Sequence, residues 1–269
     1  MKRKTVTPSD HPRADSLRIR EELIKHYRSK IVAEAGMFAH GRGEAFDYLI
    51  GERTTRNASK AIEAAAAALL TAKHPVISVN GNAAALGAKE IAKLAEVTEA
   101  KMEVNLFYRS AEREMAIKRL LEKEGASQIL GVGEASSARI AEIGSERRRV
   151  DPEGILIADV VLVPLEDGDR TEALVNMGKR VIAIDLNPLS RTAQLASITI
   201  VDNIVRALPT LVEVAQKLKT HPDQNKPKNI LANFSNKQNL SEAMILIRQR
   251  LLKLAEKGTY ISISQKGDN

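Results

Sequence analysis

The apolar positions of the first 75 residues recur with helical spacing. Asp15 or Ser16 can cap the first predicted helix, and Pro75 prevents the Ala-rich third helix from continuing. We therefore expect an N-terminal helical segment over residues 1–75. Its predicted helices cover residues 16–34, 44–50 and 55–73.

From Pro75 onward, short apolar runs rich in β-branched residues alternate with amphipathic stretches. The runs are continuously apolar, which is typical of strands buried on both faces of a parallel sheet. The pattern predicts an α/β fold with a Rossmann-like parallel sheet, flanking helices and a nucleotide-binding core over residues 76–218. The predicted strands are 76–79, 102–104, 128–132, 160–163, 181–184 and 198–201, and the predicted helices are 83–95, 110–124, 169–178 and 203–218.

The last part of the chain, residues 219–269, is predicted to hold a polar linker over 220–229 and a helix over 241–257. One narrow apolar stripe runs along that helix. It suits packing either on the helix's own domain or on a second subunit. The stripe consists of Leu240, Met244, Ile247, Leu251 and Leu254.

Polar residues follow the predicted strands, at the edge where open parallel sheets bind ligands. Asn80, Gly81 and Asn82 stand before a helix, where free backbone N–H groups favour an anion; the alternative is an ordinary turn with an Asn cap. Val132 is followed by Gly133 and Glu134.

The loop after residues 181–184 begins with Asp185, Leu186 and Asn187. An acid at this place can receive ribose hydroxyls, or it can simply cap the next segment. Arg191 and Thr192 follow in the same loop and favour the nucleotide interpretation.

The strand after that loop ends before Asp202 and Asn203. For this pair, capping of the helix that begins at Ile204 is the simpler interpretation.

Arg20 lies in one helical stripe with apolar Leu17 and Ile24, so it is expected to face inward and to bind an anion or a carboxylate. Arg42 stands between two glycines at a predicted helix entry, where its guanidinium can bind phosphate oxygens or remain solvated. His40 precedes it, and a lone histidine is more often structural.

Composition narrows the function classes. The chain has 269 residues, with 41 Lys and Arg against 34 Asp and Glu, hence a net charge of +7, which favours anionic partners. It lacks cysteine, which excludes disulfides, thiol catalysis and Cys-ligated metals and points to a reducing cytoplasm. The longest apolar stretch, residues 64–70, is far shorter than a membrane span of about 20 residues.

Four separated segments, in this order, resemble the archaeal phosphopantothenate synthetases, which are 4-phosphopantoate–β-alanine ligases of coenzyme A biosynthesis. The resemblance covers residues 8–260. The segments are HPR at 11–13 with SLRIR at 16–20, HGRGEAFDYL at 40–49, SVNGN at 78–82, and DLNPLSRT at 185–192.

The resemblance implies a homodimeric ligase that uses ATP, with Mg²⁺ expected, and releases AMP and diphosphate. It implies no nucleic-acid or membrane partner. Arg20 and Arg42 would hold the ATP phosphates, and residues 185–187 the ribose and adenine. The residues that would complete the nucleotide pocket are Arg191, Thr192, Asp202 and Asn203, and those assigned to the acid substrate are Asn80, Gly81 and Asn82.

In such a reaction the β-alanine ammonium must lose a proton. Glu134 and His40 are both candidates for the base, and the sequence does not choose between them.

Two other function classes remain open at this point. A nucleic-acid-binding protein would fit the basic net charge and the run of three arginines at 147–149. The alternative for this run is an ordinary solvated surface. Aromatic residues, at 3% of the chain, are few for base stacking. A nicotinamide-dependent oxidoreductase would fit the fold, but Gly131 and Gly133 are an incomplete dinucleotide fingerprint.

Overall fold

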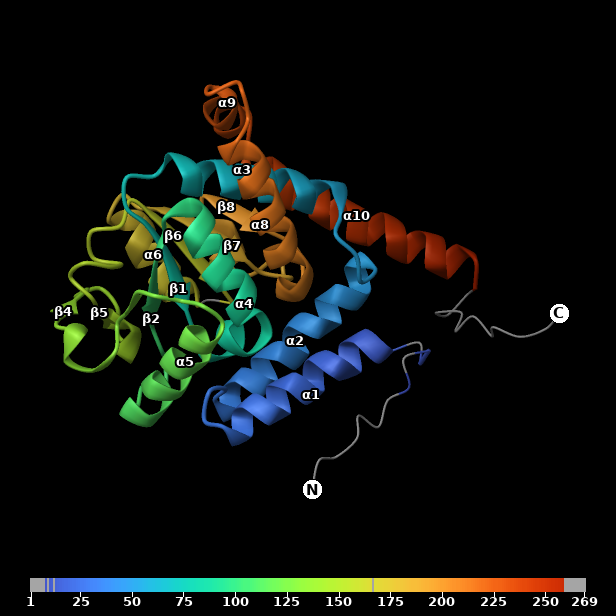
Figure 1. Ribbon diagram of the computed structural model, residues 1–269. Helices are drawn as coiled ribbons and strands as arrows, with labels where there is room; N and C mark the ends of the chain where they lie inside the picture. Colours follow the sequence, from blue (N-terminus) through green and yellow to red (C-terminus); the bar gives the residue numbers. More distant parts are fainter. Residues whose placement is uncertain (1–7, 9, 12, 166, 259–269) are drawn as a thin grey trace.

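The computed structural model describes residues 8, 10, 11, 13–165 and 167–258. The N-terminal residues 1–5, which include Lys2, Arg3 and Lys4, lie outside this part, as do Pro12 of the HPR motif and Glu166. Its centre is a six-stranded parallel sheet in the order β3-β2-β1-β6-β7-β8 (Figure 1). The strands are β1 (Pro75–Val79), β2 (Lys101–Val104), β3 (Ile129–Leu130), β6 (Val160–Pro164), β7 (Arg180–Ile184) and β8 (Ile198–Ile200).

All six predicted strands are present, and every residue of β1 and β6 is buried. The two strands pair in parallel at the centre of the sheet, with Val76 opposite Val161. From β1 the chain proceeds outward to β2 and β3, and from β6 it proceeds the other way to β7 and β8. The carboxyl ends of β1 and β6 therefore flank the point where the strand order reverses, which is the usual ligand crevice of such sheets.

Helices cover one face of the sheet, where they bury the larger apolar cluster. Val76, Val161 and Val181 face the smaller cluster on the other side. The first face carries α3 (Arg56–Thr71), α4 (Gly81–Thr98), α5 (Ala111–Lys123) and α8 (Ile204–Lys219). The second face carries α6 (Gly168–Asn176) and a segment with β4 (Ala138–Arg139), η2 (Glu146–Arg148) and β5 (Arg149–Val150). Two short elements follow strands: η1 (Gly133–Ala135) follows β3, and α7 (Arg191–Leu195) follows β7.

The N-terminal segment differs from the prediction. The expected helix over 16–34 is two elements: α1 (Ala14–Arg28) ends early, and α2 (Glu34–Ile50) begins where the first helix was expected to end. Lys30 adopts a positive φ of 64° in the connection. The N–H groups of Ile31 and Val32 both bond to the His26 carbonyl, which closes the end of α1.

The inward stripe predicted for α1 is also wrong. Ile24 is 39% exposed and Leu17 is only half-buried, and the buried positions are instead Ala14, Ser16, Leu23 and His26. α1 lies against α2 and α4, so its buried side is set by these neighbours and not by its most apolar stripe.

The C-terminal part holds α9 (Lys226–Ala232) and α10 (Asn236–Glu256). The predicted linker is therefore helical from Lys226, and α10 begins before the predicted position because Ser235 caps it. In Figure 1 the far end of α10 projects beyond the sheet domain. None of the described helices is long and apolar enough to cross a membrane.

Candidate active site at the carboxyl edge of the sheet

Helix α2 runs along the carboxyl ends of the strands and contacts the loops that follow them. The Asn82 amide, after β1, donates to the Gly36 carbonyl at 2.8 Å. The Asn203 amide, after β8, donates to the Asp47 carboxylate at 2.8 Å. One helix of the N-terminal segment thus meets the sheet edge at both halves of the sheet.

Gly36 of α2 permits this close approach. Residues 40–43 lie inside α2, so the prediction that they form a helix entry is wrong. A Cβ at Gly36 would collide with the Asn82 side chain, and one at Gly43 would lie 3.7 Å from Leu186. Glycine costs about 1 kcal/mol in a helix interior, and here tertiary contact with the sheet edge outweighs that cost.

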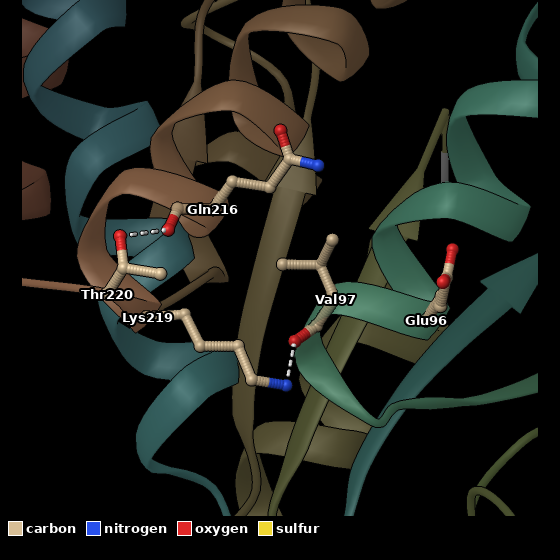
Figure 2. A pocket seen from close by; sticks show the side chains of 5 residues that line it. All are labelled: Glu96, Val97, Gln216, Lys219 and Thr220. Atoms are coloured by element: carbon tan, nitrogen blue, oxygen red, sulfur yellow. Dashed lines mark hydrogen bonds between the residues drawn. The ribbon is translucent and has the colours of Figure 1, made fainter.

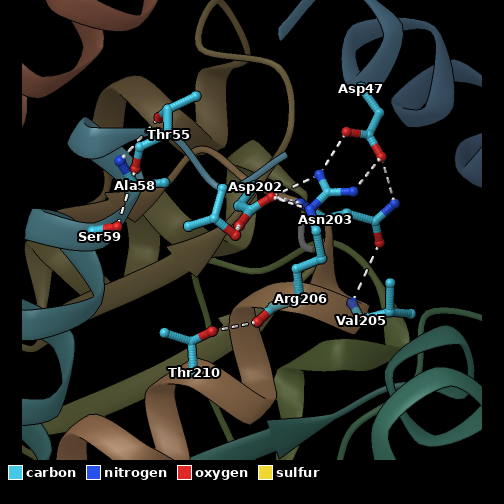
Figure 3. Close-up of polar contacts among 10 residues, drawn as sticks. Asp47, Thr55, Ala58, Ser59, Asp202, Asn203, Val205, Arg206 and Thr210 are labelled. Atoms are coloured by element: carbon cyan, nitrogen blue, oxygen red, sulfur yellow. Dashed lines mark hydrogen bonds and ion pairs between the residues drawn. The ribbon is translucent and has the colours of Figure 1, made fainter. Parts of the chain in front are cut away.

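An ion-pair network fastens α2 to the start of α8 (Figure 3). The Arg206 guanidinium donates to Asp47 at 2.6 Å and to Asp202 at 2.7 Å. Thr54 donates to the other Asp202 oxygen at 2.6 Å. Asn203 caps α8, as the simpler interpretation predicted. Asp202 and Asn203 are both buried and bonded to protein groups, so their side chains join α2 to the edge of the sheet.

Asp185 and Arg42 lie on segments that meet, because Gly43, next to Arg42, faces Leu186, next to Asp185. The Asp185 carboxylate accepts the Asn187 N–H at 2.9 Å and the Ser190 hydroxyl. Burial raises the pKa of the Asp185 carboxyl, and Ser190, the Asn187 N–H and the Arg42 charge oppose that rise. Leu186 is buried beneath this turn, while Arg42 on α2 is exposed. The structure therefore brings together an acid and a cation that the sequence placed on separate elements.

Arg191 and Thr192 begin α7, but the Arg191 side chain turns to α6. It pairs with Asp169 at 2.5 Å and Glu172 at 2.9 Å, while Thr192 is buried. Among the described contacts, none joins Arg191 to Asp185, so the sequence neighbourhood of these two residues does not become a side-chain contact.

Arg20 faces Glu44 of α2. Its Nε and Nη2 donate to the Glu44 carboxylate at 2.8–3.0 Å, and Tyr48 donates to the same carboxylate at 2.5 Å. Arg20 is thus held in the ion pair that the sequence left open as an alternative, although its side chain remains 41% exposed.

His40 lies on the same helix with a buried Nε2 that has no hydrogen-bond partner among the described residues. Burial lowers the pKa of the imidazole, and Arg20 adds to this, against Glu44 and Asp47. Glu134 is exposed in the short turn η1, after the edge strand β3. The two candidate bases therefore lie in different surroundings: His40 is partly buried with an enclosed Nε2, and Glu134 is in solvent.

The turn after β1 is tied to the neighbouring elements. Asn80 caps α4, and its amide donates to the Pro164 carbonyl at 2.7 Å. A Cβ at Gly81 would collide with the Ile31 carbonyl, so this glycine permits close approach of the α1–α2 connection. The Asn80 and Asn82 side chains serve as structural ties here, which leaves the backbone at the start of α4 as the part that can face an anion.

Sequence reasoning missed a buried ion pair in the loop after β2. Arg109 and Glu114 have side chains only 4% and 5% exposed and bond to each other. Glu114 accepts the Gly133 N–H at 2.7 Å, and Arg109 donates to the Gly131 carbonyl at 2.8 Å and to Ser136. The pair holds the loop that carries Glu134. The rule that ligands bind at carboxyl ends, applied also to β2, would have pointed to this loop.

The run at 147–149 is not a solvated surface throughout. Arg147 is 7% exposed and its Nε lies 3.3 Å from Asp167, the residue that caps α6. This overturns the prediction for Arg147, because the segment carrying it packs under the carboxyl end of the sheet and not in solvent.

Two hollows in the surface lie away from this edge. Helices of a parallel α/β fold run opposite to the strands, so the carboxyl ends of α4 and α8 lie at the amino end of the sheet. A hollow of about 250 Å³ opens there between them (Figure 2), and a larger one of about 440 Å³ adjoins α4 and the start of β2. The smaller one is lined by Glu96, Val97, Gln216, Lys219 and Thr220.

Comparisons with known proteins agree on one family. The family model for phosphopantothenate/pantothenate synthetase matches residues 57–250. A 4-phosphopantoate–beta-alanine ligase of Thermococcus kodakarensis is 53% identical over 254 residues, which cover 94% of this chain and 96% of the relative. A protein of the same name from Methanosarcina mazei is 48% identical, over 95% of this chain and 100% of the relative.

Proposed function

This chain belongs to the phosphopantothenate/pantothenate synthetase family, and from that premise we propose that it is the ligase that joins 4-phosphopantoate to β-alanine in coenzyme A biosynthesis. The observation that carries the proposal is the identity of about half the residues over nearly the whole of both chains. The Rossmann-like sheet with an acid and a cation at its carboxyl edge is compatible with an enzyme that binds a nucleotide.

The reaction needs an activated acid. A carboxylate resists attack because it is negatively charged and would have to expel oxide. We propose that a carboxylate oxygen of 4-phosphopantoate attacks the α-phosphorus of ATP, so that the bond to diphosphate breaks. The amine of β-alanine then attacks the acyl carbon, the bond to AMP breaks, and the amide forms with loss of a proton.

The first step gathers ATP, a phosphate ester and a carboxylate in one crevice. Guanidinium groups and helix amino ends stabilise such charge best where water is excluded. We assign the phosphates of ATP to Arg42 and Arg20, and the ribose and adenine to residues 185–187. Arg191, Thr192, Asp202 and Asn203 complete the pocket wall, and the turn at 80–82 receives the acid substrate.

Mg²⁺ enters this proposal as part of the nucleotide substrate. Among the described residues there is no cluster of three His, Asp or Glu side chains that could hold a metal ion. Mg²⁺ commonly uses one or two carboxylates together with substrate phosphates, so ATP would bring it.

Of the two candidate bases we favour His40. Its lowered pKa keeps the imidazole neutral at neutral pH, and its buried Nε2 is available to accept a proton. Glu134 is exposed in the turn η1 after the edge strand β3, away from the residues that follow β7 and β8.

We further propose that the enzyme is a homodimer that acts in the cytoplasm. Support for the dimer comes from α10. Leu240 is buried against the domain, whereas Met244 and Leu251, on the same helical face, are 39% and 46% exposed. A second copy of the chain would cover this face of α10 beyond the point where the helix leaves its own domain.

The experiment that tests the function is product identification. Purified protein is incubated with MgATP, 4-phosphopantoate and β-alanine, and each component is omitted in turn. The proposal expects 4′-phosphopantothenate, AMP and diphosphate, formed only in the complete mixture. ADP and phosphate would reject the adenylate route but keep the ligase, and no amide product would reject the ligase. Titrations with NADH and with duplex DNA test the two other function classes.

A further inference from the structure

The strand order limits where each end of the acid substrate can lie. This inference rests on the proposed function. The residues assigned to the ribose and adenine and to the pocket wall follow β7 and β8, on one side of the central pair β1 and β6. The carboxylate must meet the α-phosphate near that pair, so the rest of the acid extends away from the nucleotide, toward β2. Three carbon atoms lie between the carboxyl carbon of the acid and its ester oxygen. The distance between these two groups is therefore roughly one to two strand spacings of about 4.8 Å.

An arginine from the β2 side reaches the start of α4. Arg113, in the first turn of α5, donates through Nη2 to the Ile31 carbonyl at 2.9 Å and through Nη1 to the Tyr108 carbonyl. The same Nη2 lies 2.9 Å from where a Cβ of Gly81 would stand. The carbonyls account for one N–H on each terminal nitrogen, and each of these nitrogens carries a second.

This arginine lacks a carboxylate partner within the described part of the chain, where its bonds go to main-chain carbonyls. Burial lowers the pKa of the Arg113 guanidinium, and the charge of Arg147 lowers it further. The two guanidinium charges therefore act on each other, and Arg147 is held 3.3 Å from Asp167. A partly buried, positioned guanidinium beside a second cation is a favourable place for a dianion.

Arg147 is itself firmly placed. Its carbonyl accepts the amide of Asn105, the fully buried residue directly after β2, at 3.1 Å. Asp167, its partner, caps α6. Arg113 and Arg147 thus stand beside the two helices, α4 and α6, that begin at the point where the strand order reverses.

We propose that Arg113, supported by Arg147 and the amino end of α4, binds the phosphate ester of the acid substrate and so selects 4-phosphopantoate over unphosphorylated pantoate. The assignment places the two negative ends of the acid on opposite sides of the β1–β6 junction. It also gives a use to an arginine pair that the nucleotide residues leave unexplained.

The test compares two acids in one variant. For Arg113→Gln we expect kcat/KM for 4-phosphopantoate to fall about 100-fold, with KM for ATP and kcat/KM for pantoate within about threefold of the wild type. Arg119→Gln, an exposed position on the same helix, is the matched control and should leave both acids unaffected. An equal loss on both acids, or no loss on either, would overturn the proposal.

A second measurement separates this inference from the proposed function. Calorimetry measures binding of 4-phosphopantoate to the wild type and to Arg113→Gln, with thermal unfolding of both proteins as the check on folding. Binding to the wild type that the folded variant loses supports the phosphate site even if no amide is formed, an outcome that would reject only the ligase. Equal binding by both proteins would reject the site while leaving the ligase intact.

Discussion

Arg20 and Glu44 bind each other in a fork across the α1–α2 pair: the Arg20 Nε and Nη2 donate to the Glu44 carboxylate at 2.8–3.0 Å. Burial alone would raise the pKa of the Glu44 carboxyl, but hydrogen bonds from Tyr48 and Arg20 and the charge of Arg20 lower it overall. The pair joins the two helices that carry the proposed phosphate-binding arginines, so it links the fold to the site.

For Arg20→Ala we expect both stability and activity to fall. The buried Glu44 would lose its forked ion pair and keep the contacts of Tyr48 and Arg13, at a cost of about 1–3 kcal/mol in the free energy of unfolding. Urea unfolding and ATP turnover measure the two effects. Arg18→Ala removes an exposed ion pair with Asp15 and should cost less than about 1 kcal/mol. Full activity of Arg20→Ala would remove Arg20 from the proposed site.

Arg42→Ala should separate function from stability. Arg42 is exposed on α2, so its loss leaves the core intact, whereas ATP turnover at subsaturating ATP should fall by about 100-fold. Arg28→Ala, at an exposed position of α1, is the control for loss of one positive charge. An unchanged rate for Arg42→Ala, or a rate lowered equally by Arg28→Ala, would contradict the assignment.

The six strands could be predicted because each is a continuous apolar run that the sheet buries on both faces. The break between α1 and α2 could not, because no proline or glycine marks it and the positive φ falls on Lys30. The end of α1 is fixed instead by tertiary packing, in which Ile31 and Val32 are buried.

The sequence proposes candidate residues one by one, but it does not show which of them meet in space. Asp185 and Arg42 are each candidates from their own segment, and only the path of α2, in which Gly43 faces Leu186, brings the two segments together. Arg109 and Arg113 were missed because their neighbours, Gly131 and Ile31, are distant in the chain, and local spacing does not show such pairs.

His40→Gln tests the proposed base through the pH dependence of kcat. Because burial lowers the pKa of His40 below its ordinary 6.5, the imidazole gains its proton only in acid, and wild-type activity should rise with pH through that lowered value. The variant should lose about 100-fold in kcat and lack this rise. His74→Gln, exposed before β1, should keep the wild-type profile. A variant that retains the acid limb would exclude His40 as the base.

The buried carboxyl of Glu103 should make the free energy of unfolding depend on pH, independently of catalysis. It is fully buried on β2, and burial raises its pKa to about 7, against the N–H groups of Ile155 and Asp151 and the Arg170 charge. Between pH 4.5, its ordinary pKa, and about 7 the native protein keeps a proton that the unfolded chain loses, so stability falls as pH rises.

The corresponding variant is Glu103→Gln, which cannot titrate. The unfolding free energy of the wild type relative to the variant should fall by roughly 3 kcal/mol between pH 4.5 and 8. Denaturant titrations at several pH values measure this difference. Glu112→Gln, exposed on α5, should run parallel to the wild type at every pH. Parallel curves for Glu103→Gln as well would show that the buried carboxyl does not titrate in this range.

Leu251→Glu tests the dimer through the face of α10 that extends past its own domain. Leu251 is 46% exposed and lies on the helical face of the buried Leu240. In a twofold dimer, the Leu251 side chain of each copy would be buried, and each burial would contribute about 1.5–3 kcal/mol to the free energy of association. A glutamate at this position loses that contribution and adds the cost of burying a carboxylate. The dissociation constant should therefore rise by at least about 100-fold.

Sedimentation at several concentrations measures this change. Gln249→Glu places the same charge on the opposite face of α10 and should sediment as the wild type does. If the wild type is monomeric at micromolar concentration, the dimer is rejected; if Gln249→Glu dissociates as readily as Leu251→Glu, the interface is not on this face. Dissociation by Leu251→Glu alone would assign the exposed end of the stripe to the second copy.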